Sequence, residues 1–98
     1  MYKSEVRKLS EKICNVILKK KDLPCGYTYG GECAVYLKDT KLTIAKTEAE
    51  KEIAMNDDSI VCIVAYYDSP SLKEECTVEN IETKLIEALK DKGVIVTA

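Results

Sequence analysis

The chain has 98 residues, a length that accommodates one domain and leaves no room for two. Hydrophobic residues make up 46% of the chain and charged residues 33%, a globular composition that excludes a disordered protein. The formal net charge is −2, and the basic residues are fourteen lysines and one arginine, which disfavours a protein specialised for nucleic acid.

No apolar run reaches the roughly 20 residues that a membrane-spanning helix requires. The first twelve residues are charged and lack the apolar segment of a signal peptide. We therefore expect a cytoplasmic protein without membrane contact, folded as a single domain over residues 1–98. In a reducing compartment its five cysteines would be free thiols.

An apolar stripe near the N-terminus predicts a helix over about residues 3–20. Its members recur at spacings of three and four residues: Tyr2, Val6, Leu9, Ile13, Val16 and Ile17. Ser4 is the predicted N-cap, and Pro24 prevents the helix from continuing.

The stretch "CGYTYGGEC", residues 25–33, predicts a tight hairpin. Gly30 and Gly31 suit a two-residue type I′ turn, in which both central residues need positive φ. Residues 25–29 would then pair with residues 32–36. This register keeps the sulfurs of Cys25 and Cys33 too far apart for a disulfide.

A second hairpin is predicted in "AVYLKDTKLTIA", residues 34–45, around a loop at residues 38–41. Pairing Leu37 with Leu42 and Val35 with Ile44 places four aliphatic side chains on one face. Tyr36 falls on the other face, which Tyr27 and Tyr29 share if both hairpins form.

The second half of the chain alternates helices with short strands. Thr47 and Glu50 form a capping box for a helix at about residues 48–55. The uninterrupted run "IVCIVAYY", residues 60–67, predicts a central, buried strand. A helical turn with Pro70 at its first position follows.

The last helix is predicted over residues 78–91. Thr77 is its N-cap, and Gly93 stands where a helix-terminating glycine belongs. The residues "VIVT", 94–97, predict a short terminal strand.

The order of elements is therefore α-β-β-β-α-β-α-β. It predicts an α+β fold, a two-layer sandwich in which a mostly antiparallel sheet of four to five strands carries two amphipathic helices on one face. No motif in the sequence identifies a protein family.

The cysteines do not indicate a metal site. They are widely spaced, no CxxC pair occurs, and the chain has no histidine. Cys14 and Cys62 are expected as core residues. Cys76, just before the last helix, is the best candidate nucleophile, but an incidental thiol is the favoured reading because no histidine base exists. We expect no catalytic residue, metal or cofactor.

The tyrosines are the remaining candidate functional residues. Tyrosine provides a large contact area with a polar end, so a tyrosine-bearing sheet face is typical of a protein interface. The predicted binding residues are Tyr27, Tyr29, Tyr36, Tyr67 and Lys46. In the alternative interpretation, the tyrosine rings bind no partner and only cover the exposed sheet or pack in the core.

The sequence thus favours a small non-enzymatic protein-binding module, such as an inhibitor, an immunity or anti-defence factor, or an adaptor. Self-pairing of the sheet as a homodimer is a further expectation. The alternative function is nucleic-acid or nucleotide binding. The same tyrosines would then stack on bases, and three lysines at the end of the first helix would contact phosphates: Lys19, Lys20 and Lys21.

Overall fold

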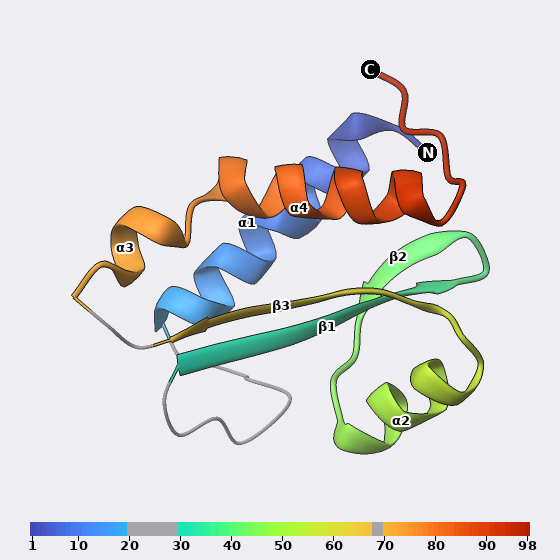
Figure 1. The fold of residues 1–98 in the computed structure, drawn as a ribbon, viewed down its shortest axis with the longest axis horizontal. Helices are drawn as coiled ribbons and strands as arrows, with labels where there is room; N and C mark the ends of the chain where they lie inside the picture. The colour runs from blue at the N-terminus through green and yellow to red at the C-terminus, as the bar shows by residue number, and fades with distance from the viewer. Residues whose placement is uncertain (20–29, 68–69) are drawn as a thin grey trace.

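The computed structural model describes residues 1–19, 30–67 and 70–98, which form an α+β fold (Figure 1). Within these residues, four helices accompany a three-stranded antiparallel sheet with the strand order β2-β1-β3. The elements in chain order are α1 (Lys3–Lys19), β1 (Gly30–Lys38), β2 (Lys41–Ile44), α2 (Glu48–Asn56), β3 (Ile60–Tyr67), α3 (Leu72–Glu75) and α4 (Val78–Asp91).

The predicted first helix is confirmed as α1. Val6, Ile13 and Ile17 are fully buried, whereas Tyr2 at the end of the stripe is 64% exposed. The predicted N-cap was wrong, because Ser4 already lies inside the first turn. The start of the helix is held instead by the backbone amide of Lys3, which donates to the carbonyl oxygen of Thr97 at 2.7 Å.

The second predicted hairpin is confirmed as β1 and β2. Val35 lies opposite Ile44, and Leu37 lies opposite Leu42. Lys38 also pairs with Lys41, so only Asp39 and Thr40 remain in the turn, with φ angles of 51° and 68°. Positive φ at both central positions is the requirement of a type I′ turn.

The predicted turn at Gly30 and Gly31 was wrong. Both glycines belong to β1, where they lie opposite Tyr67 and Tyr66 of β3. Pairing with β3 continues as far as Tyr36 and satisfies more backbone groups than a tight turn could. The expected partner strand at residues 25–29 lies outside the described residues.

The strand at residues 60–67 is confirmed as β3, but its central position was wrong. In the described sheet β1 is the central strand, and β3 lies at an edge. Val64 and Tyr66 point into the core, whereas Ile63 is 41% exposed. A continuous apolar run shows that a strand packs well but does not fix how many strands flank it.

The predicted terminal strand was also wrong. Residues 94–97 run beside the beginning of the chain, where Tyr2 and Thr97 form an isolated parallel bridge. The amide of Thr97 donates to the carbonyl oxygen of Met1 at 2.8 Å. The two ends of the chain are therefore tied to each other and not to the sheet.

The short helix α2 begins as its capping box predicts. The Thr47 hydroxyl accepts a hydrogen bond from the Glu50 amide at 3.1 Å. The Glu50 carboxylate accepts from the amide of Lys46 at 2.8 Å, one residue before the cap. Lys51 of α2 reaches β1, where its ammonium group lies 2.8 Å from the Glu32 carboxylate.

The last helix is confirmed as α4, over the predicted residues. Thr77 accepts a hydrogen bond from the Asn80 amide at 3.2 Å, and Gly93 has a φ of 81° just after the helix. The preceding α3 begins after Ser71, so Pro70 lies outside the helix and not at its first position.

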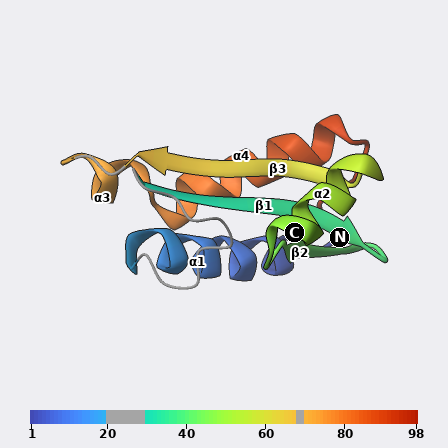
Figure 2. The same cartoon turned by 90° about the horizontal axis from the view of Figure 1, so that it is seen from below.

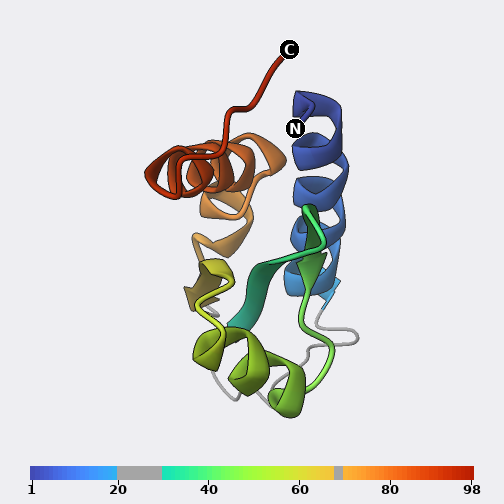
Figure 3. The same ribbon diagram turned by 90° about the vertical axis from the view of Figure 1, so that its right-hand side faces the viewer.

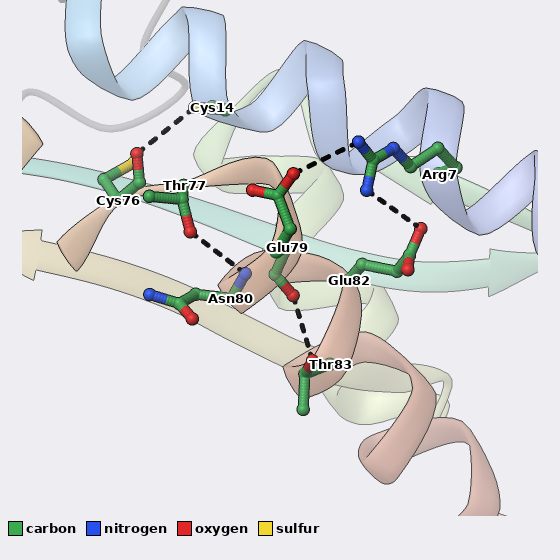
Figure 4. A network of polar contacts seen from close by, with 8 residues as sticks. All are labelled: Arg7, Cys14, Cys76, Thr77, Glu79, Asn80, Glu82 and Thr83. Atoms are coloured by element: carbon green, nitrogen blue, oxygen red, sulfur yellow. Dashed lines mark hydrogen bonds and ion pairs between the residues drawn. The ribbon is translucent and has the colours of Figure 1, made fainter. Parts of the chain in front are cut away.

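The main core lies between α1, α4 and the sheet. Figures 1 and 3 show α4 above the strands and α2 below them, and Figure 2 shows β1 and β3 running alongside each other. Arg7 of α1 lies between two glutamates of α4, 3.3 Å from Glu79 and 3.7 Å from Glu82 (Figure 4). The fully buried aliphatic residues of the core are Val6, Ile13, Ile17, Val35, Val64, Ile81, Leu85 and Leu89.

Three buried alanines lie outside this cluster. They are Ala34 of β1, Ala45 after β2 and Ala54 of α2. Side chains of alternate residues in a strand point to opposite faces, so Ala34 faces away from the side on which Val35 is buried. Small residues allow α2 to approach the sheet on that second side.

Candidate functional site

A groove with a volume of about 860 Å³ runs between the first part of α1 and the tip of the β1–β2 hairpin. This volume falls within the range of typical binding clefts. Leu9 of α1, Leu37 of β1 and Leu42 of β2 line it, and all three are half-buried. Val94, from the C-terminal segment, adds to a lining that is mostly apolar.

Part of the groove lining comes from the two ends of the described chain, which are tied together. The N-terminal ammonium donates to the carbonyl oxygen of Ile95 at 3.1 Å, and the Tyr2–Thr97 bridge continues the contact. These bonds hold Met1 and Val94 against α1. Tyr2 extends the apolar lining with an exposed ring.

Lysines surround the apolar lining. Lys8 and Lys12 of α1 and Lys41 of β2 line the groove, against a single acidic residue, Glu5. All three lysines are exposed. In the part of the chain that the structure describes, no carboxylate lies within 4 Å of their ammonium groups. The groove is therefore locally positive on a protein whose net charge is −2.

Of the four predicted tyrosines, the structure describes Tyr36 and the backbone of Tyr67, which lie at opposite ends of β1. Tyr27 and Tyr29 lie outside the described residues. Tyr36 is half-buried in β1, opposite Thr43. The backbone of Tyr67 pairs with Gly30, at the other end of β1. Six residue steps along a strand separate these two positions by about 20 Å.

Tyr66, the neighbour of Tyr67 in β3, belongs to the core. Tyr66 is only 8% exposed, and its hydroxyl accepts a hydrogen bond from the Lys84 ammonium at 3.0 Å. The same ammonium lies 4.2 Å from the centre of the ring, within the range of a cation–π contact. Tyr66 therefore anchors α4 to β3.

The two predicted lysines that the structure describes do not line the groove. Lys46 is exposed just before α2, and Lys19 is exposed at the end of α1. Lys20 and Lys21 lie outside the described residues. None of the lysines that line the groove, Lys8, Lys12 and Lys41, is among the predicted binding residues.

Cys76 is not placed to act as a nucleophile. It is 1% exposed, and burial together with the neighbouring Cys14 and Cys33 raises the pKa of its thiol to about 12. Burial also raises the pKa of Cys62, against the lowering influence of Lys84. Both thiols are therefore protonated at neutral pH.

Cys14 and Cys33 are buried, as a core role requires, and Cys62 is half-buried. Over residues 1–19, 30–67 and 70–98, no group of three or more cysteine, aspartate or glutamate side chains is arranged to hold a metal ion. In the same residues, none of the helices is both long and apolar enough to cross a lipid bilayer. Cys25 lies outside the described residues.

Sequence reasoning missed the groove because its walls are distant in the chain. The helical stripe identified Leu9, and the hairpin register identified Leu37 and Leu42, but as core residues. Lys8 and Lys12 are four residues apart and therefore share a helix face. That spacing was the one signal in the sequence that two lysines lie together beside the apolar stripe of the first helix.

Comparison of the chain with protein families, with curated proteins and with solved structures found no match.

Proposed function

We propose that the protein is a small non-enzymatic protein-binding module that masks an acidic, amphipathic segment of a partner in the groove between α1 and the β1–β2 hairpin. It would act as an inhibitor, an immunity or anti-defence factor, or an adaptor. The observation that carries the proposal is the apolar groove bordered by Lys8, Lys12 and Lys41, none of which is paired with a carboxylate among the described residues.

The apolar lining supports a partner that buries hydrophobic side chains. Leu9, Leu37 and Leu42 are only half-buried in the free protein, so covering them removes further apolar surface from water. Burial of apolar area supplies most of the free energy of protein association. The exposed ring of Tyr2 adds a residue type that is enriched among strongly contributing interface residues.

The lysines support an acidic partner in particular. A carboxylate placed beside Lys8, Lys12 or Lys41 gains a favourable interaction without displacing an existing ion pair. Rim charges of this kind mainly raise the association rate and exclude partners of the wrong sign. A basic segment would be repelled by the same three lysines.

The test is a selection of peptides from a random library on the immobilised, reduced protein. We expect the selected peptides to combine apolar residues with aspartate or glutamate. Reversing two groove charges together, Lys8→Glu with Lys12→Glu, should weaken their binding by roughly tenfold or more, or about 1.4 kcal/mol. The matched control is Lys73→Glu with Lys90→Glu, which changes the same net charge at exposed positions outside the groove.

The lining is tested separately from the charges. Tyr2→Ala removes a groove side chain that is 64% exposed, so it should weaken binding while leaving the fold intact. Tyr36→Ala is the comparison that also tests the tyrosine-bearing sheet face, because Tyr36 does not line the groove. If Tyr36→Ala abolishes binding and Tyr2→Ala has no effect, the partner occupies the sheet face and the groove proposal is wrong.

Nucleic-acid binding is distinguished in the same experiment. A single-stranded DNA of mixed sequence should neither bind the protein nor compete with the selected peptides. Binding of that DNA, with an affinity that falls steeply as salt rises, would replace the proposal with the nucleic-acid function.

A further inference from the structure

One edge of the sheet has no strand beside it in the described residues. The strand order β2-β1-β3 leaves β3 with β1 on one side only. Among the described residues, the backbone groups of Ile60–Tyr67 pair with β1 and have no second backbone partner. The outward-facing amide and carbonyl groups of this strand are therefore available.

The hairpin identifies which groups these are. The amide of Ala45 donates to the carbonyl oxygen of Ala34 at 2.9 Å, so the backbone groups of Ala34 point toward β2. Because successive residues in a strand point their backbone groups to opposite edges, those of Cys33 and Val35 point toward β3. Ile63, which lies opposite Ala34, therefore directs its amide and carbonyl outward, and so does Ala65.

Apart from an irregularity near its beginning, the edge lacks the features that usually prevent strands from associating. Natural edge strands carry charged residues, proline or bulges that obstruct a second strand. The sequence IVCIVAYY contains no charge, no proline and no glycine. The irregularity in this pairing lies opposite Val35 and Tyr36, toward the beginning of β3, and leaves Ile63 and Ala65 in regular register.

The space beside the strand is open near its end. A hollow of about 630 Å³ is lined by both Ala65 and Tyr66, with residues of α3 and α4 around it. Ala65 and Tyr66 are adjacent and point to opposite faces of the sheet. The hollow therefore opens beside the end of β3, with Glu74, Glu75 and Lys84 also around it.

We infer that two copies of this chain pair through their β3 edges in an antiparallel, two-fold symmetric arrangement centred on Val64. Ile63 of each copy then lies opposite Ala65 of the second copy. The amide and carbonyl of each of these residues bond across the interface, and the two three-stranded sheets join into one.

The second copy is the favoured occupant because the strand is complementary to itself. Ile63 and Ala65, two of its outward-facing residues, flank Val64 symmetrically, and the uncharged strand meets its own copy without like-charge repulsion. The pairing does not depend on the proposed function. The groove lies on the other side of the sheet, beside β2, so both grooves of the dimer would stay accessible.

The register is tested by charge swapping at Ile63 and Ala65. We expect the unmodified protein to change from monomer to dimer between low and high micromolar concentration in sedimentation or native mass spectrometry. A copy with Ile63→Lys and Ala65→Lys, and another with Ile63→Glu and Ala65→Glu, should each stay monomeric. When the lysine variant is isotopically labelled and mixed with the glutamate variant, the two should form a one-to-one heterodimer. In that dimer every introduced lysine faces an introduced glutamate.

Two further measurements keep the proposal falsifiable if a double variant folds poorly. Amide hydrogen exchange of the unmodified protein at Ile63 and Ala65 should slow as concentration rises, while that of Val64, already bonded to β1, stays unchanged. Ile53→Lys, on an exposed position of α2, is the control that should still dimerise. A protein that stays monomeric throughout, or dimers unaffected by both edge variants, would overturn the inference.

Discussion

The Cys14 thiol donates a hydrogen bond to the carbonyl oxygen of Cys76 at 3.3 Å, joining two residues that lie 62 positions apart in the chain (Figure 4). Cys14 belongs to α1, and Cys76 lies between α3 and α4, so the contact closes one end of the main core. Both residues are buried, and Cys33 of β1 lies near enough to influence the pKa of Cys76. These cysteines are part of the packing.

This arrangement predicts unequal thiol reactivity. With iodoacetamide at neutral pH, we expect Cys14, Cys33 and Cys76 to be alkylated only as fast as the protein unfolds, because alkylation requires an accessible thiolate. Cys62, which is half-buried, should react faster. Peptide mapping by mass spectrometry over time gives the rates, and denatured protein provides the control. Alkylation of Cys76 before Cys62 would contradict the burial described above.

The raised pKa of Cys76 predicts a loss of stability in alkali. The unfolded chain releases this proton near pH 9, whereas the folded protein keeps it until about pH 12. Between these values the unfolded state binds fewer protons, so the free energy of unfolding falls as pH rises, by at most about 1.4 kcal/mol per pH unit from this group. The contribution is fully present below pH 9.

The measurement is urea unfolding of the unmodified protein and of Cys76→Ala at several pH values from neutral to alkaline. Lysines and tyrosines titrate in the same range, so the difference between the two slopes isolates Cys76. We expect the variant to lose stability less steeply above pH 9. If the stability of both proteins falls equally with pH, the pKa of Cys76 is the same in the folded and unfolded states.

The difference in burial between Leu85 and Ile53 predicts that truncating Leu85 to alanine destabilises the protein strongly and that truncating Ile53 does so only weakly. Leu85 of α4 is fully buried, so Leu85→Ala should lower the free energy of unfolding by about 2–5 kcal/mol. Ile53 of α2 is 61% exposed, and Ile53→Ala should change it by no more than about 0.5 kcal/mol. Urea denaturation measures both. A comparable loss at Ile53 would mean that its side chain is covered in solution.

We expect substitutions of Gly93 to lower the stability of the protein only through the backbone conformation at this position. Its φ is 81°, and a Cβ added there would meet no atom within 4 Å. Gly93→Ala should therefore destabilise the protein by about 1–2 kcal/mol through backbone strain alone. Gly93→Asn should cost less, because asparagine adopts this conformation more readily. If the two variants are equally stable, the segment after α4 relaxes instead of keeping its left-handed residue.

Local patterns in the sequence predicted the helices and one hairpin correctly. The stripe of α1, the Thr47 and Thr77 caps and the glycine after α4 all lie where the chain predicts them. Each depends on residues within a few positions of one another, where spacing and capping chemistry suffice. The Leu37–Leu42 register was equally local, because the turn itself fixes it.

The errors arose where local signals competed with distant pairing. Two adjacent glycines suit a type I′ turn, yet Gly30 and Gly31 join a strand because β3, some 35 residues later, supplies their partners. The second predicted turn did form, at Asp39 and Thr40, although neither residue is a glycine and both have positive φ. Cross-strand hydrogen bonds and packing outweigh the strain at these two residues.

The sequence by itself determined the α+β class, the starts of α2 and α4 and the apolar character of Ile60–Tyr67, because periodicity and capping are properties of neighbouring residues. Tertiary structure alone decided that β3 lies at an edge and that Lys8, Lys12 and Lys41 surround one groove. It also tied Met1 to the C-terminal segment. Those relationships join residues distant in the chain, and they depend on which packing buries the most apolar surface while satisfying the backbone.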